Sequence, residues 1–300
     1  MAGIIGFGAY VPEWRISAKE ISSVWPAAAK VPGVKTKAVA DFDEDVITMG
    51  VAAAEQALSS AGVRAEEVEA VYFASTSAPC EEKSSAAIIQ TILGIPSTAV
   101  PIDISHSTRA GSVAMRTCLG QADSKQIAIG LVIAADNRLA PGGEMLEFSA
   151  AAGAVAFLIG SQGVIARVEG WSSATNEFTN VWRAYGEKFL RRHDDNRTER
   201  EASYQRSIVK AGNSLLTNNK ISAKDLNYLA IAEADGKYIQ KIAKALGMAE
   251  KTISITNIAP NVGDTGAASS LLGLASVLSK GNPGEKCLVI SYGSGCGSDA

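Results

Sequence analysis

Histidine and cysteine are scarce in this sequence, which has two of the former and four of the latter among 300 residues. The cysteines are Cys80, Cys118, Cys287 and Cys296, and none of them forms a CxxC pair. A zinc site takes about four ligands, most of them Cys or His, at short characteristic spacings. We therefore expect a protein with reduced thiols and no bound metal.

An excess of positive charge and a long apolar run are missing too. Lys and Arg number 28 against 31 Asp and Glu, a net charge of −3, so no basic surface for nucleic acid is expected. The longest apolar runs, 127–135 and 150–159, are about half of the ~20 residues that span a membrane. The N-terminal segment lacks the pattern of a signal peptide. A cytoplasmic location is expected.

What the sequence does contain is an internal repeat of alternating strands and helices. The first half is predicted as strand 3–11, helix 46–62, strand 68–74, helix 85–93, strand 98–105, helix 110–120 and strand 127–136. The second half is predicted as strand 164–171, helix 204–216, strand 226–232, helix 237–246, strand 252–256, helix 267–278 and strand 287–295. This alternation predicts mainly parallel sheets covered on both faces. We divide the chain into an N-terminal half, 1–162, and a C-terminal half, 163–300.

Helices 110–120 and 267–278 hold equivalent places in the two halves and are rich in Gly, Ala and Ser. Helices that are apolar all round are normally buried. We therefore expect an α/β sandwich in which the two halves share a central helical layer. The polar stretch 175–203 interrupts the second half and is predicted to be a surface excursion.

The repeat contains one mismatch. The first half ends with an apolar strand, 150–159, whereas the second half stops at 297–300, where the equivalent strand should begin. Buried backbone groups without partners each cost roughly 1–3 kcal/mol, and an open sheet edge attracts other strands. We expect the functional assembly to supply an extended segment beside strand 287–293, either from a longer native chain or from a partner.

Four segments, 4–21, 43–58, 261–278 and 289–300, resemble 3-hydroxy-3-methylglutaryl-CoA (HMG-CoA) synthases of the archaeal type. These belong to the thiolase superfamily, together with the ketoacyl synthase III enzymes, and the resemblance implies an αβαβα sandwich of two similar halves. The form NVGDTGAAS resembles still more closely the synthase-like, non-catalytic subunit of the bacterial monoacetylphloroglucinol acetyltransferase complex.

The resemblance also implies where catalytic residues should lie. The family's nucleophilic Cys, at a strand-to-helix turn that favours the thiolate, corresponds to Thr108. Its general-acid/base Glu corresponds to Thr76, and its His, which stabilises a developing oxyanion, corresponds to Ala232. All three positions lack the expected chemistry.

Two residues remain as candidates. Asn261 matches a family Asn that donates to the thioester oxygen, although it is equally well explained as a turn or N-cap residue. Cys296 lies in a glycine-rich loop bordering the old cavity and is a candidate nucleophile, although Cys also serves as a small buried hydrophobe. Adjacent strand residues point to opposite faces, so His106 and Ser107 are not expected to pair.

These observations favour a catalytically inactive, HMG-CoA synthase-like subunit that supports a thiolase-like partner. No tightly bound cofactor is expected beyond a possible coenzyme A thioester. The resemblance implies a homodimer or a heterodimer, with a small OB-fold, zinc-containing protein as a further partner, and stretch 126–136 or its neighbour is predicted as the pairing edge. The alternatives are an active acyl-CoA enzyme with an atypical site and a module that binds an acyl-CoA or an acyl carrier.

Overall fold

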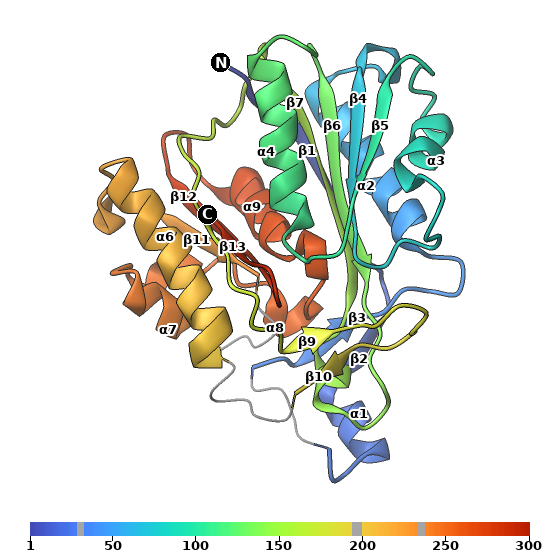
Figure 1. The fold of residues 1–300 in the computed structure, drawn as a ribbon, viewed down its shortest axis with the longest axis vertical. Helices are drawn as coiled ribbons and strands as arrows, with labels where there is room; N and C mark the ends of the chain where they lie inside the picture. Colours follow the sequence, from blue (N-terminus) through green and yellow to red (C-terminus); the bar gives the residue numbers. More distant parts are fainter. Residues whose placement is uncertain (29–32, 194–199, 233–237) are drawn as a thin grey trace.

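Two open β-sheets and the helices packed on them make up the structure (Figure 1). The computed structural model describes residues 1–28, 33–193, 200–232 and 238–300. The first sheet contains, in spatial order, β1 (Gly3–Tyr10), β7 (Ala152–Gly160), β6 (Gly130–Asn137), β4 (Ala70–Ala74) and β5 (Val100–Ile104). The β4, β5 and β6 strands are parallel, and β7 is antiparallel to both of its neighbours.

The second sheet has fewer and shorter strands. Its spatial order is β11 (Tyr228–Ile231), β12 (Cys287–Gly293), β13 (Gly297–Asp299) and β8 (Ser173–Ala174). The β11 and β12 strands are parallel, while β13 is antiparallel to β12 and β8. The relative directions of the strands in this sheet, taken in spatial order, are therefore the same as those of β4, β6, β7 and β1 in the first sheet.

Alternate residues of each sheet contact different helical layers, as expected for strands buried on both faces. In the first sheet, Phe73 packs with α2 (Val46–Ala61) and α3 (Ser85–Ile92), whereas Tyr72 packs with α4 (Ala110–Asp123). In the second sheet, Leu288 packs with α6 (Arg206–Asn218) and α7 (Tyr238–Ala245), whereas Val289 packs against the cluster that contains α9 (Ser269–Lys280).

The α4 and α9 helices therefore form the central layer that the repeat predicts (Figure 1). The α4 helix lies so close to the start of the α9 segment that a Cβ atom on Gly111 would be 2.6 Å from the carbonyl oxygen of Ala267, in the turn before α9, and 2.8 Å from Leu271 Cδ1 of α9. Small residues in these helices allow the two sheets to share one core. The predicted α/β sandwich is confirmed.

The α2 helix shows how local sequence sets the element bounds. Asp45 caps its first turn by accepting hydrogen bonds from the backbone N–H groups of Ile47 and Thr48, both at 2.8 Å. Gly62 ends it with φ of 64°, a left-handed conformation that glycine adopts without strain.

The remaining elements lie mostly at one end of the molecule, below the sheets in Figure 1. They are β2 (Arg15–Ser17), α1 (Ala18–Val24), β3 (Thr36–Ala38), β9 (Val181–Trp182), β10 (Arg191–Arg192) and α8 (Ala259–Val262). Single turns of 3-10 helix cover Ala65–Glu67, Met145–Phe148, Ala223–Asp225, Glu250–Ile253 and Gly266–Ala268, and a π-helical turn at Arg200–Gln205 leads into α6.

Two strands predicted in the second half are wrong. Residues 252–256 form the end of a 3-10 turn rather than a strand. The Thr252 hydroxyl donates to Ala249 O at 2.6 Å and the Thr256 hydroxyl to Leu229 O at 2.5 Å. Such side-chain hydrogen bonds to backbone carbonyls compete with the pairing of a strand. Residues 164–171, all of them described, pair with another strand only through a bridge from Ala166 to Ile4.

Stretch 126–136 is not an edge strand, contrary to the prediction. Most of stretch 126–136 lies in β6, which is enclosed between β4 and β7 in the middle of the first sheet. Its apolar run is explained by burial on both faces rather than by an exposed edge. The outermost strand on that side is β5, the neighbour of β4.

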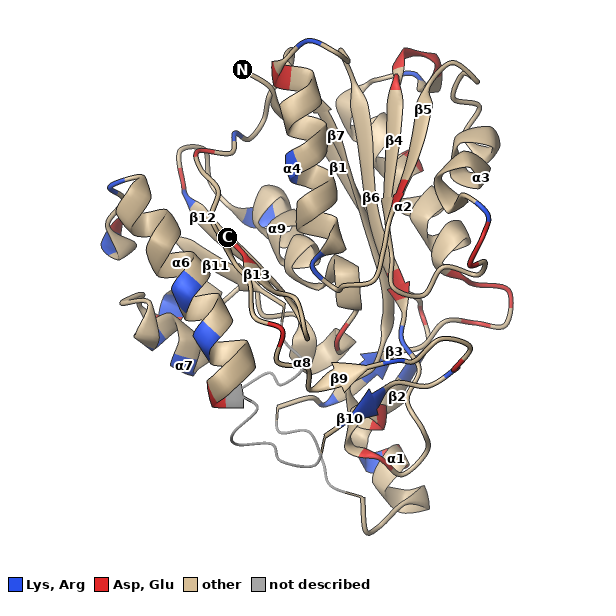
Figure 2. Cartoon of the chain, in the orientation of Figure 1, with Lys and Arg blue, Asp and Glu red and all other residues tan. Residues whose placement is uncertain are grey.

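The polar stretch 175–203 is less superficial than predicted. It carries the β9–β10 hairpin, and its Leu190 and Ser203 are buried. Part of it, together with the beginning of the predicted helix 237–246, lies outside the described residues. Figure 2 shows Lys and Arg on the outward surfaces of α6 and α7 and beside β2 and β10.

Within the described ranges, no helix is long and apolar enough to cross a membrane. The same ranges contain no group of three His, Cys, Asp or Glu side chains placed to hold a metal ion.

Candidate functional site

The candidate site lies where the carboxyl ends of β4, β5 and β6 meet the loops of the second half. Adjacent parallel strands end at one edge of a sheet, so the residues that follow them gather there. Thr76 follows β4, Thr108 follows β5 and Ala232 follows β11. Hydrogen bonds connect each of these positions to the structure around it.

Thr76 is held by the buried side chain of Asp136 at the end of β6. Its backbone N–H and its hydroxyl donate to the two carboxyl oxygens, at 2.7 and 3.0 Å. Ser75 and Ser77 donate to the same side chain at 3.0 and 2.7 Å. The backbone N–H of Ala267 completes the set at 2.8 Å. Asp136 therefore fixes the loop after β4 to the start of the α9 segment.

Thr108 joins the two halves. Its hydroxyl donates to the backbone carbonyl of Tyr292, in β12, at 2.7 Å. The Tyr292 ring packs on Tyr204 with 4.9 Å between centroids. Tyr204 in turn donates from its hydroxyl to Ala232 O at 2.8 Å. The Thr108 and Ala232 positions are thus linked through two tyrosines.

A buried ion pair lies directly after Thr108. Arg109 Nη2 is 2.9 Å from Asp299 Oδ1, and Arg109 Nη1 donates to Cys296 O at 3.0 Å. Asp299 also accepts hydrogen bonds from Ser112 at 2.9 Å and Ser173 at 2.7 Å. The start of α4 is therefore tied to β13 and β8.

A second ion pair, between Arg138 and Asp264, borders the same region. Both side chains are largely buried, and Asp264 also accepts the backbone N–H of Gly266 at 2.9 Å. Gly266 has φ of 57°, and a Cβ atom there would lie 2.1 Å from Asp136 Oδ2. The segment that precedes α9 is therefore packed tightly on the Asp136 side chain.

The 175–193 segment covers this region from outside. The guanidinium of Arg183 donates to the backbone carbonyl of Thr76. Tyr185, on the same segment, is hydrogen-bonded to Glu81, which raises the pKa of the Tyr185 hydroxyl. These contacts come from a part of the chain that the sequence alone predicts to be a plain surface excursion.

The structure places the two remaining candidates differently. Asn261 is exposed on α8, and its backbone carbonyl accepts the Thr36 hydroxyl at 2.8 Å. Cys296 is a free, half-buried thiol in the turn between β12 and β13, beside Arg109. Its backbone N–H donates to Gly293 O at 3.0 Å, which fixes the turn.

The other thiols and the histidines lie outside the network. Burial raises the pKa of Cys118 and that of Cys287 to about 12, so both stay protonated at neutral pH. Cys80 is exposed in the loop after β4. His106 Nδ1 is 2.7 Å from Ser105 Oγ, and within the described residues no hydrogen bond joins His106 to Ser107. His193 stacks on Trp182 with 4.6 Å between ring centroids.

The arrangement favours structural hydrogen bonds over covalent chemistry. A hydroxyl becomes a nucleophile when a neighbouring base takes its proton. The Thr108 hydroxyl donates to an amide carbonyl, which is not a base at neutral pH, and the Thr76 hydroxyl donates to a side chain already used by Ser75 and Ser77. Ala232 offers no polar side chain.

Comparisons with known proteins identify the family. Residues 216–300 match the model described as 3-oxoacyl-[acyl-carrier-protein (ACP)] synthase III C terminal. The chain is 36% identical over 304 residues to a hydroxymethylglutaryl-CoA synthase of Methanopyrus kandleri, covering 99% of this chain and 86% of that protein. It is 39% identical over 303 residues to the Aeropyrum pernix protein of the same name, covering 100% and 83%. The chain belongs to the hydroxymethylglutaryl-CoA synthase family.

Solved structures show the same fold at lower identity. The priming β-ketosynthase of the R1128 polyketide pathway superposes with a TM-score of 0.86 at 22% identity, covering 100% of this chain and 94% of that chain. An HMG-CoA synthase complexed with CoA gives a TM-score of 0.81 at 17% identity, covering 99% and 80%. The thiolase-like sandwich and the HMG-CoA synthase resemblance are confirmed. The finer likeness to the acetyltransferase subunit stays a prediction.

Sequence reasoning missed the charged residues that hold this HMG-CoA synthase-like site together. The sequence alone assigns no role to Asp136, Arg109 or Asp299, although Asp136 and Arg109 each carry a signal. Asp136 is the sole charged residue of the run 127–136, and Arg109 immediately precedes the apolar α4 helix. A charge next to a predicted buried element needs a partner. The partner could not be named, since Arg109 and Asp299 are far apart in the chain.

Proposed function

We propose that the chain is a non-catalytic, HMG-CoA synthase-like subunit of an acyltransferase or thiolase assembly. One observation carries the proposal: Thr76, Thr108 and Ala232 occupy the three positions where the family resemblance implies catalytic side chains. Two of them are tied into hydrogen bonds that hold the fold together, and the third has no functional group. Acyl-CoA chemistry in the assembly then belongs to a thiolase-like partner.

The ion pairs and hydrogen bonds of the candidate site support this role. Asp136, Arg109 and Arg138 all have partners, and they join the loops after β4, β5 and β6 to the second half. A structural subunit needs a fixed shape, because its contribution is a surface for a partner. The intact scaffold supports a function that depends on shape rather than on a reactive group.

The proposal that coenzyme A is involved rests on the names of the proteins to which this chain is similar. Proteins up to 39% identical are named hydroxymethylglutaryl-CoA synthases, and a solved HMG-CoA synthase with the same fold is complexed with CoA. We propose that a CoA thioester is handled at the assembly, and that this chain holds no tightly bound cofactor of its own.

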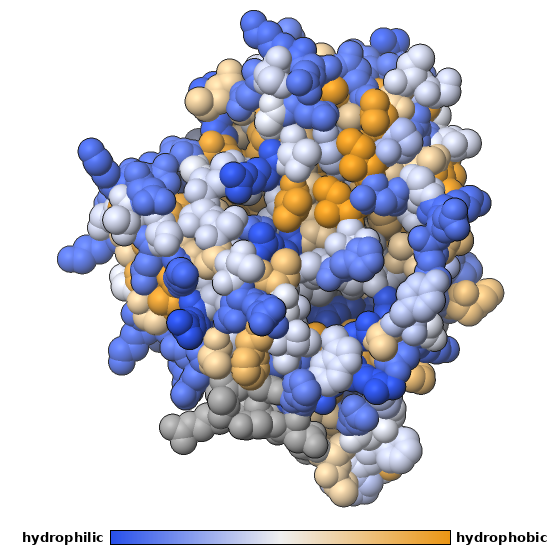
Figure 3. Space-filling view, in the orientation of Figure 1, coloured by the Kyte–Doolittle hydropathy of each residue, from blue (hydrophilic) through white to orange (hydrophobic). Residues whose placement is uncertain are grey.

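The β5 edge is the surface that we propose for a homodimer or a heterodimer with the thiolase-like subunit. Among the described residues, β5 has a strand on one side only, and its Val100 is 54% exposed. Figure 3 shows apolar side chains at the surface beside α4, over β4 and β5, and Ile102 and Ile104 are half-buried there. An apolar open edge is a template for pairing. A small OB-fold, zinc-containing protein remains a proposed third component, by analogy with the acetyltransferase complex.

A second candidate function is an acyl-CoA enzyme that uses Cys296. Its thiol is free and half-buried, in a turn beside Arg109, so an acyl group could be carried there. Among the described residues, no base is hydrogen-bonded to this thiol. The lack of a base beside the Cys296 thiol favours the structural role over the enzymatic one.

The test is condensation by the chain alone. The purified chain is mixed with acetyl-CoA and acetoacetyl-CoA, and release of free CoA is followed beside the Methanopyrus kandleri protein. We expect a rate no higher than that of the buffer blank for this chain. Turnover by this chain that is lost in Cys296→Ser would favour the second candidate and overturn the proposal.

A further inference from the structure

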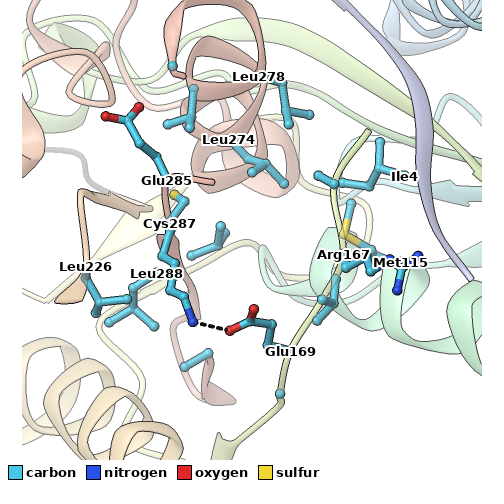
Figure 4. Close-up of a pocket in the computed structure, with 18 of the residues that line it drawn as sticks. Ile4, Met115, Arg167, Glu169, Leu226, Leu274, Leu278, Glu285, Cys287 and Leu288 are labelled. Carbon is cyan, nitrogen blue, oxygen red and sulfur yellow. Dashed lines mark hydrogen bonds and ion pairs between the residues drawn. The ribbon is translucent and has the colours of Figure 1, made fainter. Parts of the chain in front are cut away.

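A cavity of about 640 Å³ lies between β12 and stretch 164–171 in the second half (Figure 4). Leu274 and Leu278 of α9 line it. The ion pair of Lys286 with Glu169, at 2.9 Å, bridges its two walls. Its apolar side chains therefore face inward. In the first half, by contrast, large apolar side chains reach the outer surface beside β2.

Trp14, Ile16 and Phe42 are the large apolar side chains at this outer surface. Trp14 and Ile16 alternate with Arg15 around the start of β2, and Phe42 lies in the loop between β3 and α2. The backbone N–H of Val39 donates to Trp14 O at 3.1 Å, which holds the two segments together. The exposed fraction is 63% for Trp14 and 96% for Phe42. Aromatic side chains of this size contribute strongly to binding when a partner buries them.

The loop that carries Phe42 is held in one shape by its own hydrogen bonds. Asp41 accepts from Trp14 Nε1 and from the backbone N–H of Phe42, both at 2.7 Å. Glu44 accepts the backbone N–H of Asp41 at 2.8 Å and the hydroxyl of Tyr10. The two aromatic rings are therefore presented on a fixed frame, and a partner that binds them orders little of this loop.

Acidic side chains surround the rings. Glu13 and Asp43 are exposed, and among the described residues neither has a hydrogen-bond or ion-pair partner. The pKa of the Tyr10 hydroxyl is raised to about 12 by its hydrogen bond to Glu44, by burial and by nearby negative charges. Those charges belong to Glu44, Asp43 and Glu13, which therefore lie close together. Figure 2 shows Asp and Glu along the loop between β3 and α2.

The cation on this stretch leaves the carboxylates available. Arg15 lies between Trp14 and Ile16, but its guanidinium donates to the backbone carbonyls of Pro12 and Trp14 and not to a carboxylate. A guanidinium from another molecule can both stack on an indole ring and pair with carboxylates. We refer to Trp14, Ile16, Phe42, Glu13 and Asp43 together as the acidic aromatic surface.

We propose that the acidic aromatic surface docks an arginine-rich, partly apolar segment of a partner polypeptide. In the complex, a guanidinium covers the Trp14 ring, and Glu13 and Asp43 pair with further basic side chains. Aliphatic side chains of the partner bury Phe42. The inference goes beyond the proposed function and holds whether or not the chain catalyses a reaction, because none of these residues belongs to the candidate site.

A lipid bilayer and a second copy of this chain are the competing occupants. Segments that lie in a bilayer interface are typically rich in Lys and Arg beside their aromatic residues, whereas this surface is acidic and is repelled by anionic lipids. A second copy would offer the Lys and Arg of α6 and α7 (Figure 2). Neither helix exposes a large apolar side chain that could cover Phe42. A different polypeptide therefore fits best.

The test is binding of a short fluorescein-labelled peptide of alternating Arg and Leu to the 300-residue chain, measured by fluorescence anisotropy. We expect saturable binding that weakens at high salt, because the charges are exposed. It should be at least tenfold tighter than binding of the same peptide with Glu in place of Arg. A peptide with Lys in place of Arg should bind several-fold more weakly, since an ammonium group lacks the planar stacking of a guanidinium.

Matched protein variants locate the site. Asp43→Lys should weaken peptide binding at least tenfold. Glu66→Lys makes the same change of charge in the exposed 3-10 turn Ala65–Glu67 and should leave binding within twofold. Phe42→Ala should weaken binding at least fivefold without changing the urea midpoint. Tyr185→Ala removes another aromatic side chain, 86% exposed, and should leave binding unchanged.

Four results would overturn the proposal. One is the absence of saturable binding, and another is equal affinity for the Arg and Lys peptides. Equal weakening by Asp43→Lys and Glu66→Lys would show that binding follows net charge alone. Binding of phosphatidylcholine vesicles that is lost in Phe42→Ala would identify a bilayer as the occupant. Self-association of the unmodified chain that is lost in Asp43→Lys would identify a second copy, so the count of overturning results includes this one as the alternative to the bilayer.

Discussion

Arg109 and Asp299 form a buried ion pair, 2.9 Å between Nη2 and Oδ1, across the boundary between the two halves of the chain. Arg109 opens the central α4 helix, and Asp299 lies in β13. The pair is supported by Cys296 O on one side and by the hydroxyls of Ser112 and Ser173 on the other. The ion pair therefore holds the start of α4 against β13 at the candidate site.

Breaking this pair should be costly. Arg109→Met leaves Asp299 buried without its charged partner, and such a loss typically destabilises a protein by about 3–5 kcal/mol. Arg64→Met breaks the pair of Arg64 with Glu67, whose side chains are 76% and 43% exposed, and should leave the urea midpoint unchanged. Urea denaturation followed by circular dichroism compares the two. Equal midpoints would show that the Arg109 pair has no structural importance.

Alkaline pH should weaken the fold through its buried thiols. Burial raises the pKa of Cys118 from 9.0 to about 12. Between these values the unfolded chain loses the thiol proton and the folded chain keeps it, so the free energy of unfolding falls as pH rises. The slope is at most about 1.4 kcal/mol per pH unit for one thiol.

Cys118→Ala should therefore flatten the dependence of stability on pH above 9, measured by urea denaturation at several pH values. Leu119→Ala is the control, because it removes volume from the same helix without removing a titrating group. It should lower stability by a similar amount at every pH. A Cys118→Ala curve parallel to that of the unmodified chain would contradict the burial of this thiol.

Association should depend on the β5 edge. A lysine on an edge strand opposes pairing with another strand, so Val100→Lys should weaken dimerisation at least tenfold in sedimentation experiments. Phe42→Lys changes a side chain that is 96% exposed in the loop before α2, and it should have no effect. An unmodified chain that stays monomeric at high concentration, with every partner absent, would count against this interface.

The repeated order of helices and strands was predictable because each element carries its own hydrophobic pattern. The central helices α4 and α9 were predictable from their equivalent places in the two halves and from their apolar, small-residue composition. Residues 164–171 show the limit of such patterns, since they keep the alternation of a strand but, within the described residues, pair only through the bridge from Ala166 to Ile4. A strand forms when its backbone pairs with a neighbouring strand, and the sequence of one segment does not show whether such a neighbour is present.

The candidate site was predictable in part. The resemblance indicated Thr76, Thr108 and Ala232, which lie at the carboxyl ends of β4, β5 and β11. Their hydrogen-bond partners, Asp136 and the carbonyl of Tyr292, are far away in the chain. Pairings over such distances depend on the packed fold rather than on local sequence.

The most direct test of the central claim is the intact mass of the chain after incubation with acetyl-CoA. The account predicts no increase by an acetyl group on this chain, and the Methanopyrus kandleri protein is treated in the same way for comparison. Stable acetylation of this chain, mapped to Thr108 or Cys296 and lost in Thr108→Val or Cys296→Ser, would contradict it.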